Sequence, residues 1–99
     1  METQLPKQVY FQNEDCRVEY QIYEDVVNIH CEMYKATPRT IRNGYRIFVE
    51  MQKYFKEQGY KALITITPNP KFVEMYGGVF VSTVVYDEKE YEVFKWVLN

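Results

Sequence analysis

The sequence is poor in the side chains that hold metals or attack substrates covalently. It has one histidine and two cysteines, and the cysteines, Cys16 and Cys31, lie fifteen residues apart. A zinc site needs about four clustered ligands, so this composition offers no metal-binding constellation. No serine nucleophile motif is present either. We expect no metal centre, and we expect both cysteines to be free thiols, as buried small hydrophobes rather than a disulfide or redox pair.

Long apolar runs and a strong net charge are also absent. No stretch approaches the ~18 apolar residues of a membrane span, and the N-terminal METQLPKQVY lacks the apolar core of a signal peptide. We therefore expect a cytoplasmic protein that does not bind a membrane. The formal net charge of -2 argues against nucleic-acid binding over a large surface, so any basic site must be local.

The composition that is present suits one small domain. A hydrophobic fraction of 46% over 99 residues is enough for a single core, so we assign residues 1–99 to one domain and expect 1–7 to be frayed. Ten tyrosines and six phenylalanines favour strands.

One long helix is predicted from Lys35 to Gly59. Thr37 is placed as the N-cap, Pro38 suits the first helical position, and Gly59 follows the last turn. The apolar residues of this segment are spaced by four and three and predict one buried stripe, with Gln52 as its polar exception: Ile41, Tyr45, Phe48 and Phe55.

Strands are predicted on both sides of this helix. Cys16–Tyr23 and Val27–Tyr34 alternate apolar and polar residues and are nearly contiguous, so we expect an antiparallel hairpin with a tight turn. Val9–Phe11 is a further short strand. After the helix, the apolar run Ala62–Thr67 is typical of a strand buried on both faces. A strand, a helix and a strand in succession imply a right-handed crossover between parallel strands.

The rest of the chain predicts a short helix and a closing hairpin. Lys71–Tyr76 has room for one or two helical turns before two glycines. The hairpin joins Val79–Tyr86 to Tyr91–Leu98 around the turn Asp87–Glu90. The resulting order, β-β-β-α-β-α-β-β, predicts an α+β fold in which a mixed central sheet carries its major helix on one face.

The long helix has an unusual distribution of charge. Lys35, Arg39, Arg42 and Arg46 lie at its N-terminal end, where the helix dipole is already positive. This arrangement disfavours helix stability unless an anion is nearby. The cluster is either a basic, solvated helix end or a local site for an anionic partner.

From Cys16 to the end, this order resembles the C-terminal two-thirds of the GNAT acetyltransferase fold. In that family a strand leads into a phosphate-cradling turn and a long helix, and a second parallel strand is followed by a short helix with an Asn before it and a Tyr-x-x-x-Gly-Phe ending. The matching segments here are Val27–Tyr34, Thr37–Gly59, Ala62–Thr67 and NPKFVEMYGGVF from Asn69 to Phe80. The chain also looks like the small GNAT-like internal virion proteins of tailed bacteriophages, whose helix is also basic and whose phosphate loop is also eroded.

The resemblance implies a site for the pyrophosphate of acetyl-CoA, formed by the family motif Arg/Gln-x-x-Gly-x-Gly/Ala. Here Arg39 and Gly44 match the ends of the motif, whereas Arg42 replaces its middle glycine and would crowd a pyrophosphate. The candidate cofactor-binding residues are Arg39, Arg42, Asn43, Gly44 and Asn69.

The resemblance also implies candidate catalytic residues. Tyr76, seven residues after Asn69, is a candidate acid for the leaving thiolate, although counting back from Gly77 gives Val73 and leaves Tyr76 as a core or rim aromatic. Glu32 is a candidate base, with His30 as its substitute near neutral pH. Glu32 and His30 are otherwise two polar residues on a solvated strand face.

Three functions remain open from the sequence. The eroded motif favours a GNAT-like domain without cofactor or enzyme activity that serves in phage virion assembly or host interaction, in the host cytoplasm or the virion. The alternatives are a minimal acetyl-CoA-dependent N-acetyltransferase and a module that binds anions or nucleic acid through its basic helix end. About fifteen residues precede the hairpin, too few for the family's acceptor-binding strand and two helices. We expect a protein partner or a second copy, for which strands such as Tyr91–Leu98 offer an edge.

Overall fold

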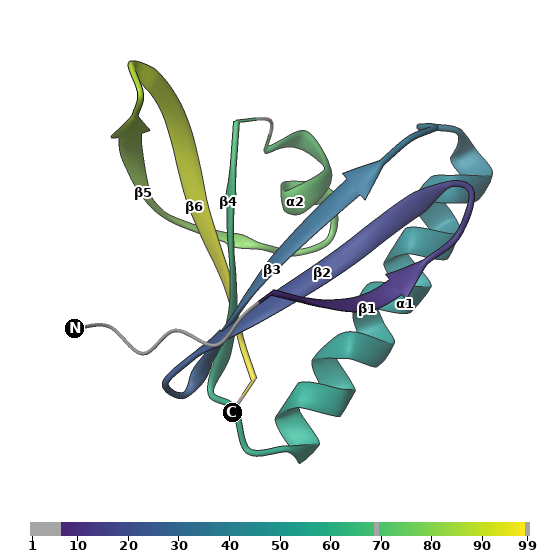
Figure 1. Cartoon of the computed structure of the whole chain (residues 1–99), viewed down its shortest axis with the longest axis horizontal. Helices are drawn as coiled ribbons and strands as arrows, with labels where there is room; N and C mark the ends of the chain where they lie inside the picture. The colour runs from purple at the N-terminus through teal and green to yellow at the C-terminus, as the bar shows by residue number, and fades with distance from the viewer. Residues whose placement is uncertain (1–6, 69, 99) are drawn as a thin grey trace.

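The computed structural model describes residues 7–68 and 70–98, so the predicted fraying of residues 1–6 lies outside the described part. The element order is the predicted one (Figure 1). In chain order the elements are β1 (Gln8–Gln12), β2 (Cys16–Tyr23), β3 (Val26–Met33), α1 (Pro38–Glu57), β4 (Ala62–Thr67), α2 (Lys71–Met75), β5 (Val79–Tyr86) and β6 (Lys89–Val97).

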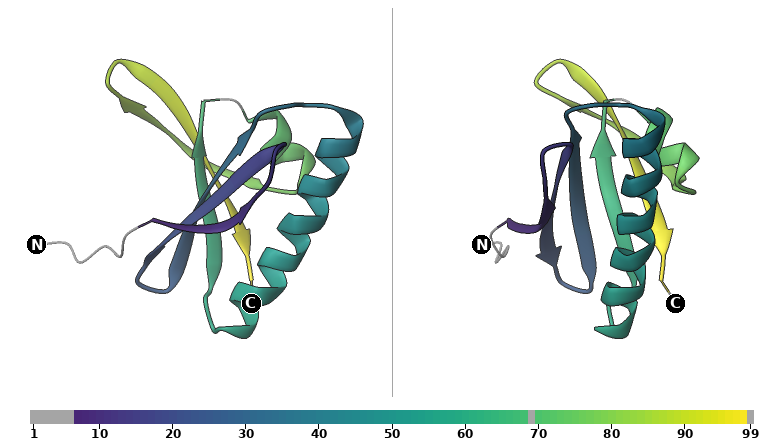
Figure 2. Two further views of the ribbon diagram at one scale, coloured as in Figure 1. Left: turned by 45° about the vertical axis from the view of Figure 1, so that its right-hand side comes forward. Right: turned by 90° about the vertical axis from the view of Figure 1, so that its right-hand side faces the viewer.

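The strands form one six-stranded mixed sheet in the order β1-β2-β3-β4-β6-β5. Strands β3 and β4 are parallel, and α1 makes the crossover between them; the other neighbouring pairs are antiparallel. The long helix runs along one face of the twisted sheet (Figure 2). These observations confirm the predicted α+β fold with a mixed sheet. The β6 strand lies between β4 and β5, so it is not the free edge that we expected at Tyr91–Leu98.

The two predicted hairpins have turns of two residues each. Tyr23 pairs with Val26, so the predicted tight turn between β2 and β3 is confirmed. Tyr86 pairs with Lys89, so the second turn is Asp87–Glu88, and the longer predicted turn to Glu90 is wrong. Asp87 and Glu88 both have left-handed φ, +52° and +63°, the conformation that two-residue hairpin turns require. Neither residue is a strong turn signal, so the sequence did not reveal where the turn ends.

The predicted limits of the long helix are confirmed. The Thr37 hydroxyl accepts a hydrogen bond from the Thr40 N–H at 3.2 Å, and the Thr37 N–H donates to the Thr40 hydroxyl at 2.9 Å, which completes a capping box. Pro38 is the first helical residue, and Gly59 follows the last turn with a left-handed φ of +94°.

The predicted buried stripe of α1 is only partly right. Phe48 and Phe55 are buried with Met51 in the core, whereas Tyr45 is 50% exposed. In its first half α1 instead turns Thr40 and Gly44 toward the rest of the protein, since Thr40 is buried and Gly44 lies against Tyr76. Thr40 and Gly44 are not apolar, so the hydrophobic pattern could not reveal them.

The core lies between α1 and the sheet. Phe55, Met51, Leu63 and Val27 are its most buried large side chains, and Trp96 packs on Phe48 with ring centroids 4.5 Å apart. The prediction that Ala62–Thr67 is buried on both faces is wrong, because Ile66 is 45% exposed. Ile66 points away from α1, so β4 is buried mainly on its helix-covered side.

Both cysteines are free, as predicted, but only Cys16 is buried; Cys31 is exposed. Among residues 7–68 and 70–98, no group of three or more His, Cys, Asp or Glu side chains is arranged to hold a metal ion. In the same residues, no helix has the length and apolar character needed to cross a membrane.

Candidate functional site

Strands β3 and β4 separate in the middle of the sheet. They pair only through Val26–Asn28 and Ala62–Ile64, although β3 continues to Met33 and β4 to Thr67. At the first position beyond this ladder, the Thr65 hydroxyl donates to the Ile29 carbonyl at 3.0 Å, in a buried hydrogen bond. The two strands then diverge toward their carboxyl ends (Figure 1). The sheet therefore has a wedge-shaped opening at its parallel pair.

An apolar cavity of about 240 Å³ lies at this opening on the helix-covered face. It is smaller than the ~300–1,000 Å³ of typical small-molecule pockets, which suits a narrow chain rather than a bulky ligand. Its wall comes from both separated strands, from α1 and from α2, and includes Cys31, Met33, Thr65, Phe48, Val73 and Tyr76.

A polar cavity of about 110 Å³ lies beside the same opening. Its polar lining residues include Glu19, Gln21, Asn28 and His30. His30, together with Ile29 and Ile66, lines both cavities, so an apolar and a polar cavity lie next to each other at the separated strands. The sequence could not reveal Glu19, Gln21 and Asn28, because their proximity depends on the register of β2 against β3.

The two candidate bases on β3 have different surroundings. His30 lies at the junction of the two cavities. Glu32, two residues further along the strand, pairs across the sheet with Arg17 and is exposed, and it lines neither cavity. His30 is therefore better placed than Glu32 to meet a group bound in the opening.

The thiol of Cys31 faces the apolar cavity. Cys31 is exposed, and it is one of the residues that line this concave apolar site. Burial, with smaller contributions from Cys16 and Glu32, raises the pKa of Cys31 to about 11. The side chain is therefore a neutral thiol near neutral pH, unlike an activated nucleophilic cysteine.

Tyr76 follows α2 and joins that helix to α1. Its hydroxyl donates to the Ile41 carbonyl at 2.8 Å, and its ring stacks on Phe48 with centroids 5.8 Å apart. Burial is the largest cause that raises the pKa of Tyr76 to about 12. Of the two roles left open by the sequence, these contacts favour the rim aromatic, because the hydroxyl is already bound to the α1 backbone.

Gly44 lies directly beneath the Tyr76 hydroxyl. A Cβ atom at position 44 would come within 2.7 Å of the Tyr76 hydroxyl oxygen and 3.5 Å of Met33 Cε. This close approach requires glycine whether or not a phosphate binds. The match of Gly44 to the family motif is therefore explained by packing.

The N-terminus of α1 offers few free backbone donors to an anion. Pro38 has no N–H, and the N–H groups of Thr40 and Ile41 donate to the Thr37 hydroxyl and carbonyl. Residues 42–44, including Asn43, lie inside the helix, where their N–H groups bond four residues back. Among the first-turn donors only the Arg39 N–H has no bond of this kind, so backbone atoms cannot form a full phosphate cradle here.

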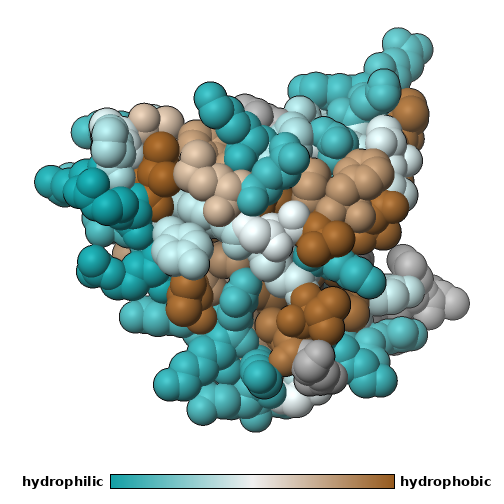
Figure 3. Space-filling view, turned by 180° about the vertical axis from the view of Figure 1, so that it is seen from behind, coloured by the Kyte–Doolittle hydropathy of each residue, from teal (hydrophilic) through white to brown (hydrophobic). Residues whose placement is uncertain are grey.

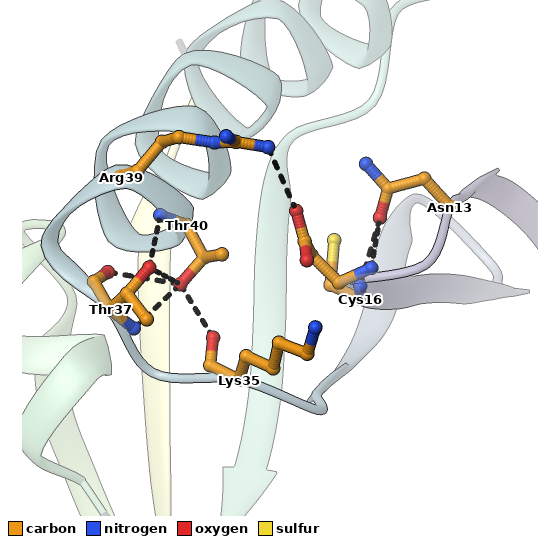
Figure 4. Close-up of polar contacts among 7 residues, drawn as sticks. Asn13, Cys16, Lys35, Thr37, Arg39 and Thr40 are labelled. Atoms are coloured by element: carbon orange, nitrogen blue, oxygen red, sulfur yellow. Dashed lines mark hydrogen bonds and ion pairs between the residues drawn. The ribbon is translucent and has the colours of Figure 1, made fainter.

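The basic side chains near this end have different surroundings. Arg39 reaches toward Asp15, with 4.0 Å between the guanidinium nitrogen and the carboxylate oxygen (Figure 4). Arg42 and Arg46 line an open groove of about 590 Å³ that also includes the acidic residue Glu50 together with Tyr45, Val49 and Met75. Asn69, the remaining candidate from the sequence, lies outside the described residues.

Comparison with known proteins identifies the fold. No protein-family model and no curated protein sequence matches this chain. Among solved structures, an aminoglycoside 6'-acetyltransferase type Ii matches with a TM-score of 0.73 and 14% identity, over 86% of this chain and 62% of that chain. The Escherichia coli ribosomal-protein-S18-alanine N-acetyltransferase matches with a TM-score of 0.66 and 10% identity, over 89% and 65%. An acetyltransferase from Bacillus cereus matches with a TM-score of 0.68 and 17% identity, over 96% and 73%.

These matches show that the chain has the GNAT fold, as the sequence predicted. They show the fold alone, because their sequence identities are low. The chain spans 62% of the length of the aminoglycoside acetyltransferase, less than two thirds of it. The predicted likeness to bacteriophage virion proteins receives no support from these matches.

Proposed function

We propose that this domain binds an acyl thioester of the acyl-CoA type at the opening between β3 and β4 and transfers the acyl group to an amine. The observation that carries the proposal is the pair of neighbouring cavities at that opening, one apolar and one polar, which share Ile29, His30 and Ile66 in their linings. An acyl chain with its thioester arm requires an apolar cavity, and an amine requires a polar one. The phage-type interaction role favoured by the sequence has no comparable structural support.

The polar cavity is suited to an amine. The amide oxygen of Asn28 can accept N–H groups, and the Glu19 carboxylate, which pairs with Arg17 at 2.9 Å, adds negative charge. Lys7 also lines this cavity, so its positive charge favours a neutral amine over an ammonium. In the transfer, the amine nitrogen attacks the thioester carbonyl, a C–N bond forms and the C–S bond breaks. His30 accepts the proton that the amine loses, since it lies where the two cavities meet. The leaving thiolate takes up one proton from the imidazolium or from water.

The phosphates of a CoA-type substrate would be held mainly by side chains. The capping box occupies most backbone donors at the start of α1. Arg42 and Arg46 lie on the outer groove of α1 with Tyr76, and Tyr76 also lines the apolar cavity. A ligand arm could therefore pass from the cavity to these two guanidinium groups, which are suited to phosphate oxygens.

The proposal is tested by titrating the full chain with acetyl-CoA in a calorimeter. Cys31→Phe fills the apolar cavity and is expected to abolish the binding heat, whereas Val97→Phe, at a residue 64% exposed and outside the cavity, is expected to leave it unchanged. Both variants are first checked for cooperative unfolding. An absence of heat from the wild-type chain at millimolar acetyl-CoA would refute the proposal.

Transfer is measured separately, as release of free thiol in the presence of a panel of primary amines. His30→Gln is expected to lower the transfer rate at least tenfold while the affinity for acetyl-CoA stays within twofold. Replacing both Arg42 and Arg46 by alanine is expected to weaken binding, and replacing both Lys53 and Lys56, at the other end of the helix, is the charge-matched control. Equal binding by the double variant and the control would contradict the assignment of the phosphate site.

A further inference from the structure

The β5 strand is an unprotected edge of the sheet. It pairs with β6 on one side and is last in the strand order, and no described strand pairs with its other side. All eight of its residues, VFVSTVVY, are exposed, and none is charged or proline. An edge strand of this length with β-branched, uncharged residues presents a row of unpaired backbone N–H and C=O groups that can add another strand.

The opposite edge differs in each of these respects. The β1 strand has five residues, includes two glutamines, follows Lys7, and loses its regular register between Val9 and Phe11. Short length, polar side chains and irregular register are the devices that protect an edge from pairing. In β5, a register shift between Phe80 and Ser82 still leaves Ser82–Tyr86 in uninterrupted pairing with β6.

The position of β5 leaves its outer edge accessible. The β5–β6 hairpin projects away from α1 and from the other half of the sheet (Figures 1 and 2). Val85 and Tyr86, near the tip, are 70% and 73% exposed. Seen from behind, hydrophobic residues form several patches, including one on the side of the molecule where this hairpin lies (Figure 3).

We propose that β5 pairs antiparallel with β5 of a second copy of this chain, which joins the two sheets into one. The strand is suited to self-pairing because it brings no like charges into opposition. A two-fold axis near the middle of Ser82–Tyr86 would place β-branched residues opposite one another, and both copies would contribute the same surface.

The charges that flank β5 favour this antiparallel arrangement. The acidic turn Asp87–Glu88 follows one end of the strand, and Lys95 of β6 pairs with Val79 at the other end. Antiparallel pairing brings the acidic turn of each copy to the Lys95 end of the other copy. The turn and Lys95 are then about two strand spacings, or ~10 Å, apart, which is about one Debye length at 0.1 M salt. Parallel pairing would bring the two acidic turns together instead.

The test is sedimentation velocity of the full chain over a wide concentration range. Wild type is expected to sediment as a dimer that dissociates on dilution. Val84 lies at the centre of the regular run, so in Val84→Lys, and separately in Val84→Glu, like charges meet near the two-fold axis. Each variant is expected to raise the dimer dissociation constant at least tenfold. Val9→Lys, the same change at the β1 edge, is the matched control and is expected to leave the dimer intact.

Mixing the Val84→Lys and Val84→Glu variants in equal amounts separates pairing from misfolding. Opposite charges then meet at the axis, so a heterodimer is expected to form although each variant alone is a monomer. A wild-type chain that remains monomeric up to millimolar concentration overturns the proposal. So does a Val9→Lys variant that dissociates as readily as Val84→Lys, or a mixture that fails to associate.

Discussion

Gly44 and Tyr76 provide the sharpest test of how α1 is built. A Cβ atom at position 44 would come within 2.7 Å of the Tyr76 hydroxyl oxygen. The Tyr76 ring cannot easily retreat, because it is stacked on Phe48 and meets the edge of Tyr45 at 5.5 Å between centroids. The effect of Gly44→Ala on the free energy of unfolding should therefore depend on whether the Tyr76 hydroxyl is present.

The expected magnitudes follow from opposing effects. Alanine in place of glycine within a helix stabilises by about 0.8–1.0 kcal/mol. Against this, displacing the Tyr76 hydroxyl loses its hydrogen bond to the Ile41 carbonyl, about 0.5–1.5 kcal/mol, and overpacking costs about 1–3 kcal/mol more. Gly44→Ala alone should lower the free energy of unfolding by about 0.5–3.5 kcal/mol.

In the Tyr76→Phe background the sign should reverse. The next atoms that a Cβ would meet are Met33 Cε at 3.5 Å and the ring Cζ at 3.8 Å, both ordinary contacts. Gly44→Ala should then stabilise by about 0.8–1.0 kcal/mol. The two substitutions should thus be coupled by about 1.5 kcal/mol or more, well above the ~0.5 kcal/mol scatter of independent sites.

The assay is urea unfolding of the four proteins in this cycle. Trp96 is the only tryptophan and is buried, so its fluorescence reports unfolding directly. Additive effects of the two substitutions would refute the packing explanation of Gly44. A destabilising Gly44→Ala in the Tyr76→Phe background would refute it as well, since no hydroxyl would remain to be displaced.

Three further stability predictions follow from single contacts. Burial raises the pKa of Tyr76 to about 12 from the usual 10, so the contribution of this hydroxyl to stability is complete below pH 10 and is lost as the pH rises through 12. Over this range, the unfolding free energy of wild type should therefore fall relative to that of Tyr76→Phe, as measured by urea titrations at each pH. Thr37→Ala removes the acceptor for the Thr40 N–H and should cost about 1 kcal/mol, or about 4–8 °C in Tm by calorimetry. Thr65→Val leaves the Ile29 carbonyl without this hydroxyl donor and should lower the unfolding free energy by about 1–3 kcal/mol, with faster amide exchange in β3 than in a Thr83→Val control.

The fold was largely predictable because its signals are local. Alternation in Cys16–Tyr23 predicts the β2 strand from its own residues, and Thr37 with Pro38 marks the start of α1 in the same way. The helix face was not predictable at Thr40 and Gly44, since the first is polar and the second has no side chain. The orientation of Gly44 is set by its contact with Tyr76, some thirty residues later in the chain.

The site was less predictable because it depends on where pairing stops. The sequence of β3 and β4 favours strands throughout, and nothing in it indicates that the ladder ends after Asn28 and Ile64. His30 could be named from its position on β3, but its place between two cavities follows from that separation. The same holds for Glu19 and Gln21, which only the β2–β3 register brings beside His30.

The basic end of α1 can now be divided into two parts with different roles. Arg39 faces Asp15, so its unfavourable interaction with the helix dipole is partly offset within the protein. Arg42 and Arg46 line the open groove beside Tyr76, which also includes Glu50, four residues after Arg46 on the same helix. The helix dipole acts mainly within the first turn, so for Arg42 and Arg46, the fifth and ninth helical residues, the main unfavourable interaction is their mutual repulsion at i,i+4. A bound phosphate would relieve this repulsion, and because the capping box occupies most of the backbone donors, we expect these two side chains to make most of its contacts.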